Sequence, residues 1–436
     1  MKIQKCHDHV IGRVALLVGC TALVLSLSGT TAQAGPRDAA RQTLGTNDGW
    51  GAYGTGTTGG ATSDAAHVYT VTTWEQFKAA LKDGGSAPRI IKVQGMIDAV
   101  SQGCEAFEAE GYDFQKYLAD YDPAVWGHDK PVSGAQEDLR AASAAQQDKA
   151  IKANVPANTT IIGLGKNSGI LGGSLQIKGV DNVIVRNLTI EAPVDCFPQW
   201  DPTDDNKTGA WNSEYDGVVV YGSTHVWIDH NTLTDGRYPD SSLPSYFGKT
   251  YQQHDGLADV VRGSNHVTVS WNSFKDHDKT MLIGNSDSAT ADDTGKLKVT
   301  LHHNRFEGIV ERAPRVRFGQ VDSYNNHFVV TKGQKWGYVY GIGKESRLVA
   351  EHNAFTLAQG ISTGKILKKW NEAPLTANGN YVNGKAVDLI AVHNAEIPGE
   401  TLQSGAGWTP TLRAGVDPAK AVPGIVNAGA GAGRVC

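Results

Sequence analysis

Short runs of alternating aliphatic and polar residues recur along this chain of 436 residues, and most of them end at an asparagine. Six such phrases occupy Val183–Leu188, Val226–Asn231, Val267–Asn272, Val299–Asn304, Val321–Asn326 and Leu348–Asn353. Alternation with a period of two residues predicts strands that bury one face. We therefore expect an all-β protein with an internal repeat.

The spacing of these phrases distinguishes between all-β folds. Asn304, Asn326 and Asn353 are separated by 22 and 27 residues, and earlier intervals of 32 to 44 residues leave room for loops. A repeat in the low twenties is typical of a parallel β-helix, a solenoid whose coils stack into parallel sheets. We expect the asparagine at the bend between strands, with a left-handed backbone and a hydrogen bond to the next coil. The alternative is a β-sandwich, which carries no single repeated phrase.

Two segments depart from the repeat. Thr72–Leu81 is predicted to be a helix that caps the open end of the solenoid, with Thr72 and Glu75 in capping-box spacing. The stretch 104–152 is charged and rich in alanine, with short helical patterns and proline breaks. We interpret it as a long excursion from the solenoid rather than a separate domain.

The first 34 residues have the pattern of a secretory signal peptide. Basic residues precede an apolar run from Val14 to Leu27, and Ala32-Gln33-Ala34 supplies a small-residue cleavage site. No later stretch is long and apolar enough to cross a bilayer. We expect a secreted protein with no membrane partner, whose residues 35–436 form one domain. Because capping segments close both ends of the repeats, we expect a monomer.

Cysteine usage leaves one question open. Cys104, Cys196 and Cys436 remain after removal of the signal peptide. Three thiols allow one disulfide at most, and the sequence does not decide which pair forms it.

Three arginines gather in a chain that is otherwise mildly acidic. Arg312, Arg315 and Arg317 flank Pro314, and the last two arginines are two residues apart, so both point to the same face of a strand. The net charge of −5 and the pI near 6.3 argue against a nucleic-acid binder with a broad basic surface. The arginines therefore indicate a local site for an acidic ligand.

Aspartates upstream supply a second kind of chemistry. Asp255 and Asp259 are four residues apart, and Asp216 lies 39 residues before Asp255, close to two coils of the repeat. Stacked coils can bring such residues to one patch of the same face. Carboxylates without Cys or His partners form an oxygen-rich site suited to calcium, although surface aspartates in turns would give the same spacing.

Three motifs follow one another along the chain: Trp-Ile-Asp-His at 227–230, His-Asp-Lys at 277–279 and Arg-Ala-Pro-Arg-Val-Arg-Phe-Gly at 312–319. In order and spacing they resemble the extracellular pectate lyases of polysaccharide lyase family 1, particularly the bacterial subgroup. The resemblance runs from about Gly49 to Trp408-Thr409-Pro410. It implies a right-handed parallel β-helix and a lyase that cleaves polygalacturonate by β-elimination.

Carried over to the matching positions, the resemblance implies that Asp216, Asp255 and Asp259 bind calcium. Asp204 is a further candidate calcium position. The same resemblance makes Arg312 the base that removes the sugar C5 proton.

The resemblance also places Lys279 and Arg317 on substrate carboxylates, and Arg315 is a further candidate for substrate binding. A guanidinium in solution loses its proton only above about pH 12. We therefore expect calcium, the neighbouring cations and burial to favour the neutral form of Arg312, and the pH optimum to be alkaline.

Three other functions compete with this interpretation. A pectin lyase acting on methylated polymer would share the fold without needing three aspartates. A polygalacturonase would need a pair of carboxylates, one acid and one base, which we do not find. A non-catalytic adhesin or carbohydrate-binding β-helix would keep the repeats and lose Arg312.

The histidines do not have the spacing of a zinc site. We expect them to serve packing and hydrogen bonding, with the tandem pair on opposite faces of a strand: His230, His254, His277, His302 and His303.

Overall fold

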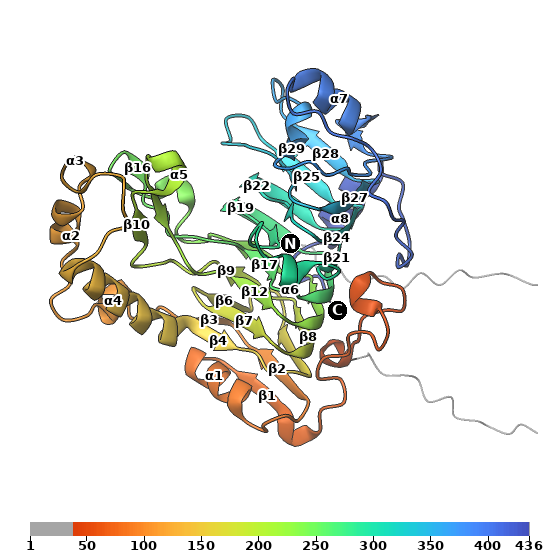
Figure 1. The fold of residues 1–436 in the computed structure, drawn as a ribbon. Coiled ribbons are helices and arrows are strands. Elements are labelled where there is room, and N and C mark those ends of the chain that lie inside the picture. The colour runs from red at the N-terminus through yellow and green to blue at the C-terminus, as the bar shows by residue number, and fades with distance from the viewer. Residues whose placement is uncertain (1–37, 436) are drawn as a thin grey trace, which may run out of the picture. The chain divides into compact units, whose positions relative to one another are not determined.

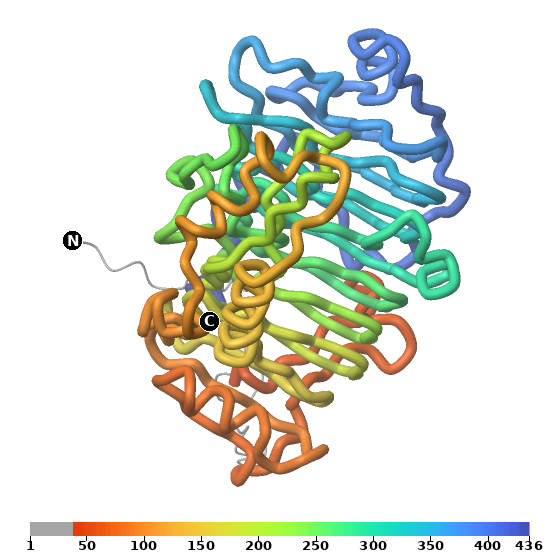
Figure 2. Tube along the Cα trace, turned by 60° about the vertical axis from the view of Figure 1, so that its left-hand side comes forward, coloured from red at the N-terminus to blue at the C-terminus, as the bar shows by residue number. Residues whose placement is uncertain are grey.

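Three long sheets run side by side through residues 38–435, the part of the chain that this computed structural model describes. A typical coil contributes one strand to each sheet, and strands of successive coils pair in parallel (Figure 1; Figure 2). The protein is a parallel β-helix, as the repeat predicted. The expected signal peptide and Cys436 lie outside the described residues.

Within each sheet the strands follow one another along the solenoid. The nine-stranded sheet contains β1 (Val68–Val71), β2 (Arg89–Val93), β5 (Thr159–Gly163), β8 (Asp181–Arg186), β13 (Thr224–Asp229), β18 (Asn265–Ser270), β21 (Lys298–His302), β24 (Gln320–Tyr324) and β27 (Arg347–Glu351). The ten-stranded sheet contains β3 (Met96–Asp98), β6 (Gly169–Leu171), β9 (Thr189–Glu191), β14 (Thr232–Thr234), β19 (Ser273–Lys279), β22 (Arg305–Glu311), β25 (His327–Val330), β28 (Ala354–Leu357), β30 (Tyr381–Val382) and β31 (Lys385–Ala386). The eight-stranded sheet contains β29 (Leu367–Lys369), β26 (Tyr340–Ile342), β23 (Arg315–Val316), β20 (Leu282–Ile283), β17 (Ala258–Val261), β12 (Val218–Tyr221), β7 (Ser174–Lys178) and β4 (Lys152–Asn154).

Two hairpins and several helices complete the described residues. The hairpins pair β10 (Gln199–Asp201) with β11 (Ala210–Asn212) and β15 (Ser245–Tyr246) with β16 (Lys249–Thr250). The helices are α1 (Trp74–Lys82), α2 (Phe114–Asp120), α3 (Pro123–Trp126), α4 (Ala135–Ile151), α5 (Asp204–Lys207), α6 (Thr290–Asp293), α7 (Leu389–Glu396) and α8 (Val422–Gly429). Short 3-10 turns occupy Ala39–Arg41, Trp50–Ala52, Ala65–His67, Cys104–Phe107, Asp240–Ser242 and Gly364–Ile366. None of these helices has the length and apolar character of a membrane span.

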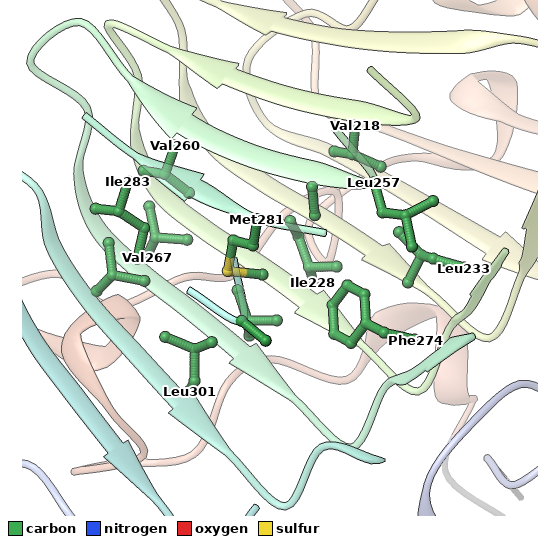
Figure 3. Close-up of a cluster of buried hydrophobic side chains, with 14 of the residues drawn as sticks. Val218, Ile228, Leu233, Leu257, Val260, Val267, Phe274, Met281, Ile283 and Leu301 are labelled. Atoms are coloured by element: carbon green, nitrogen blue, oxygen red, sulfur yellow. The ribbon is translucent and has the colours of Figure 1, made fainter. Parts of the chain in front are cut away.

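Aliphatic and aromatic side chains from all three sheets fill the interior of the coils. Figure 3 shows Ile228 of β13, Leu233 of β14 and Val260 of β17 pointing into this core, and each has no exposed surface. Burial of a side chain of this size stabilises the fold by roughly 1.5–3 kcal/mol. One column of rings in the ten-stranded sheet stacks at centroid distances of 4.8, 4.7 and 4.9 Å: Phe274, Phe306, Phe328 and Phe355.

An asparagine ladder lies at the bend between the nine-stranded and ten-stranded sheets. The backbone N–H of Asn272 donates to Oδ1 of Asn304 at 2.9 Å, and that of Asn304 donates to Oδ1 of Asn326 at 2.9 Å. The side-chain amide of Asn304 also donates to the carbonyl of Val269 at 2.9 Å. The expected coil-to-coil asparagine contact is therefore confirmed.

The position of the left-handed residue was predicted wrongly. Positive φ angles occur at His230 (51°), Trp271 (55°) and His303 (55°), each one residue before a ladder asparagine. In the first phrase Asn187 itself is left-handed (57°), and the strand register aligns it with His230 rather than with the ladder. The bend needs one left-handed residue, and the following asparagine supplies the hydrogen bonds.

Helix α1 covers one end of the solenoid beside β1 (Figure 1). Its buried Trp74, Phe77 and Leu81 join the main core, so the predicted capping role is confirmed. The predicted cap was one residue early: Thr73, not Thr72, accepts the N–H of Gln76 at 3.2 Å. The helix therefore begins at Trp74.

The excursion 104–152 contains α2, α3 and the 17-residue helix α4. It packs on a small aromatic core that includes Tyr117, Trp200 and Trp211. A disulfide between Cys104 and Cys196 ties the start of the excursion to the segment before β10, which answers the pairing question left open by the sequence.

Candidate active site

Apart from Asp204, the predicted site residues come from four successive coils, near the bend where the ten-stranded sheet passes into the eight-stranded sheet. Asp216 precedes β12, Asp259 lies in β17, Lys279 ends β19, and Arg312 follows β22. Parallel register carries them toward one another, since Asp259 is aligned with Val219 of β12 and Lys279 is aligned with Glu311 of β22. The stacking of coils thus brings distant parts of the sequence to one outer face.

Gly256 lies between two of the predicted metal ligands. Its N–H donates to Oδ1 of Asp216 at 2.8 Å, and a Cβ on Gly256 would stand 2.4 Å from Oδ1 of Asp259 and 2.8 Å from Oδ1 of Asp216. Oδ1 of Asp259 accepts the N–H of Leu282 at 2.9 Å. The absence of a side chain at Gly256 therefore allows both carboxylates to approach the same space.

Burial and mutual repulsion make it energetically costly for Asp216 and Asp259 to carry a negative charge. Burial, followed by the charges of Asp259 and Asp255, raises the pKa of Asp216 well above its ordinary value. Burial and the charge of Asp255 raise the pKa of Asp259 to about 7. A cation placed among these carboxylates would relieve both effects.

Two cationic side chains adjoin the carboxylates. Nζ of Lys279 lies 3.7 Å from Oδ1 of Asp255. Arg312 is close enough for the charges of Asp259 and Asp255 to act on its pKa. The guanidinium and the acidic group therefore lie on the same side of the molecule, which is the arrangement that base catalysis by Arg312 needs.

Arg312 has an acidic neighbour that bears on its charge state. Nε of Arg312 donates to Oε1 of Glu311 at 2.9 Å. Burial lowers the pKa of Arg312, but Glu311, Tyr338, Asp259 and Asp255 together raise it above its ordinary value. The expectation that calcium, the neighbouring cations and burial favour neutral Arg312 stays a prediction, and the neutral form must be reached against the charge of Glu311.

Arg315 begins β23 and Arg317 follows it; both are partly exposed, whereas the intervening Val316 is buried. Nε of Arg317 donates to Oδ1 of Asp287 at 2.5 Å, and its Nη1 donates to the carbonyl of Gly284 at 2.9 Å. The guanidinium of Arg315 instead lies 4.2 Å from the ring centroid of Trp370. The expected alternation of this strand is thus present.

Asp204 stands apart from the other acidic candidates. It is exposed on the short α5, where its carboxylate accepts from the N–H of Asp205 and from the side-chain amide of Asn212. It is not among the charges that shift the pKa of Asp216. The structure does not join Asp204 to the group around Gly256.

Among residues 38–435, one group of potential metal ligands has its donor atoms within 4.8 Å of one another: Asp235, Asp240 and His277. The predicted ligands Asp216, Asp255 and Asp259 do not form such a group. His277 Nδ1 lies 2.5 Å from Oδ1 of Asp235, and its Nε2 lies 2.7 Å from the carbonyl of Asp255. Both ring nitrogens face acceptors and therefore act as donors, which leaves no lone pair for a metal. His277 fixes the backbone of Asp255, a role that its sequence context did not indicate.

The tandem histidines were predicted to lie on opposite faces of a strand, and this prediction is wrong. Nδ1 of His302 lies 2.9 Å from Nδ1 of His303, because the left-handed backbone at His303 turns the chain at the end of β21. Nε2 of His303 contacts Oδ2 of Asp417 at 3.0 Å. They are buried hydrogen-bonding residues, as expected of the histidines in general.

Comparison with known proteins agrees with this fold. A family model described as pectate lyase matches residues 19–112 and 127–397. A pectate lyase of Bacillus subtilis (strain 168) is 44% identical over 426 residues, which cover 95% of this chain and 98% of the relative. Pectate lyase E of Dickeya chrysanthemi is 37% identical over 403 residues, or 89% of each chain.

Solved structures show the same likeness. A thermostable pectate lyase is 41% identical with a TM-score of 0.88, and a pectate lyase bound to a hexasaccharide is 43% identical with a TM-score of 0.86. Each comparison covers 92% of this chain and 100% of the other. These matches show that the chain is a lyase. The chain belongs to the pectate lyase family.

Proposed function

We propose that this protein is a secreted, calcium-dependent pectate lyase that cleaves α-1,4-linked polygalacturonate by β-elimination and releases 4,5-unsaturated oligogalacturonides. The observation that carries the proposal is the packing of Asp216, Asp255 and Asp259 beside Lys279 and Arg312. An acidic sugar polymer is a ligand whose carboxylates match both a bound cation and the neighbouring basic side chains.

Asp216, Asp255 and Asp259 would hold the calcium ion. Their donor atoms are all carboxylate oxygens, the ligands that this hard cation prefers. Burial, followed by the charges of neighbouring aspartates, raises the pKa values of Asp216 and Asp259, and a divalent cation between the carboxylates would oppose both effects. Bound calcium would withdraw charge from a substrate carboxylate as a Lewis acid.

Arg312 would accept the proton from C5 of the uronate. The C5–H bond breaks, its electron pair forms the C4–C5 double bond, and the C4–O bond breaks with its electrons leaving on the oxygen, which takes a proton from solvent. Lys279 and Arg317 would stabilise the negative charge that develops on the C6 carboxylate, and Arg315 would hold a neighbouring carboxylate. Arg312 must be neutral to start this step, so the reaction should be favoured at alkaline pH.

The remaining expectations concern the whole chain. We propose that residues 1–34 direct export and are removed, and that residues 35–436 act as one monomeric domain. Size-exclusion chromatography with light scattering of the exported protein checks the monomer, and its N-terminal sequence checks the cleavage site.

One assay separates the candidate functions. Incubation with polygalacturonate should produce the ultraviolet absorbance of an unsaturated uronide, and a calcium chelator should abolish it. New reducing ends without this absorbance would indicate a hydrolase, and binding without either signal would indicate a carbohydrate-binding β-helix. Chelator-resistant activity on methylated pectin would indicate a pectin lyase.

A further inference from the structure

Arg315 differs from the two arginines beside it. Arg312 pairs with Glu311, and Arg317 pairs with Asp287. Arg315 has no acidic partner in the described part of the chain, and its Nε is buried without a hydrogen-bond acceptor. Its positive charge is thus available to an anion that is not part of the protein.

The eight-stranded sheet continues from β23, which begins at Arg315, through β26 to β29, and β29 lies toward the C-terminal end of the solenoid (Figure 1). Register aligns Leu282, Arg315, Gly341 and Lys368 in one row, and the row faces outward because the alternate residues of these strands are buried. Neighbouring strands are about 4.8 Å apart, so Arg315 and Lys368 are separated by roughly 10 Å. Asp259 adjoins the row through its hydrogen bond to Leu282, so the row begins at the proposed calcium site.

Gly341 opens the path between Arg315 and Trp370. A Cβ on Gly341 would stand 3.0 Å from Cγ of Arg315 and 2.9 Å from Cε2 of Tyr338. Arg315 can therefore cross β26 and lie on the ring of Trp370, which follows β29. Tyr338 packs its edge on the same ring at a centroid distance of 6.1 Å.

A groove of about 380 Å³ adjoins this aromatic platform. Its lining includes Glu311, which is next to Arg312, together with Lys365, Lys368, Trp370 and Glu400. Trp370 remains 45% exposed, so one part of its ring is free to pack on a ligand. The groove thus reaches the residue next to Arg312 and combines an aromatic surface with basic groups.

We propose that Trp370 and Arg315, flanked by Lys368, form an accessory subsite for a uronate unit of the polymer that lies beyond the reacting units. The sugar ring packs on Trp370, and its carboxylate pairs with Arg315. Lys368, which pairs with Glu400 in this structure, adds positive charge at the far end. The inference rests on the proposed lyase function and assigns these residues to chain-length preference rather than to chemistry.

The test compares oligogalacturonides of increasing length with the polymer. Trp370→Ala should lower kcat/KM on long substrates roughly tenfold through KM, and should leave the shortest cleavable oligomers unaffected. Trp370→Phe should restore most of the loss, and Lys368→Ala should give a smaller loss with the same length dependence. Tyr221→Ala removes a 42% exposed aromatic from β12 of the same sheet and should change neither substrate class.

The outcomes that test the accessory subsite differ from the outcome that tests the lyase function. Unchanged kinetics of Trp370→Ala on the polymer would overturn it, and so would an equal loss on short and long substrates with a lowered kcat. A wild-type protein that gives no unsaturated product from any substrate would instead refute the lyase function.

Discussion

The backbone N–H of Gly256 donates to Oδ1 of Asp216, and the same glycine lies against the carboxylate of Asp259. Two acidic side chains from neighbouring coils therefore share one small space. Their closeness depends on a position that carries no side chain. Burial, followed by the charges of Asp259 and Asp255, raises the pKa of Asp216 well above its ordinary value, so the closeness of the two carboxylates contributes to that shift.

Gly256→Ala should weaken calcium binding about 10- to 100-fold, because the new methyl group displaces both carboxylates. Isothermal titration calorimetry with calcium chloride measures the effect. Gly424→Ala is the control, since a Cβ there meets no atom within 4 Å. Equal calcium affinity in the Gly256 variant and the wild type would show that these carboxylates do not hold the ion.

Glu311→Gln should shift the pH profile of kcat/KM toward lower pH. Glu311 is the largest of the charges that raise the pKa of Arg312, so its neutralisation should make the deprotonated arginine easier to form. Ultraviolet assays from neutral to strongly alkaline pH measure the shift, with the exposed Glu75→Gln as control. A profile that stays in place, or moves to higher pH, would count against Arg312 as the titrating base.

Asp195→Asn should flatten the dependence of stability on pH. Asp195 is 2% exposed, and burial raises its pKa to about 7, so the folded protein binds a proton between about pH 4 and 7 that the unfolded chain releases. The contribution of Asp195 to stability is therefore fully present below pH 4 and is lost as pH rises toward 7, by on the order of 4 kcal/mol. Urea unfolding at pH 5 and pH 8 with chelator measures the slope, and an identical slope in variant and wild type would contradict the assignment.

Asn304→Ala should destabilise the solenoid by about 3 kcal/mol or more, because it leaves several buried groups of the ladder unpaired. Urea unfolding measures the loss. Asn378→Ala at an exposed asparagine should cost much less. Equal costs at the two positions would show that the ladder contributes little.

The architecture could be predicted because it repeats. Strands with six similar sequences pair in register, so the alternation of apolar and polar residues in one of them predicts most of the core residues in the others. The left-handed residue was misplaced by one position because two adjacent polar residues suit the bend in different ways: His303 supplies the backbone angle and Asn304 supplies the hydrogen bonds.

The candidate site was only partly accessible from the sequence. Motif spacing selected the aspartates, Lys279 and the arginines, but it did not show how neighbouring groups set their charges. Glu311 is adjacent to Arg312 in the sequence, yet only the structure shows that it accepts from the Nε of Arg312. The disulfide joins residues separated by 92 positions, and this pairing depends on where the excursion packs.

The central claim is that Arg312 takes the C5 proton of a sugar acid held beside a calcium ion. The most direct measurement is the turnover of Arg312→Lys on polygalacturonate, followed by the absorbance of the unsaturated product, with calcium affinity determined on the same preparation. We predict that turnover is nearly abolished while calcium binding is largely preserved. A variant that keeps most of its activity would contradict the claim.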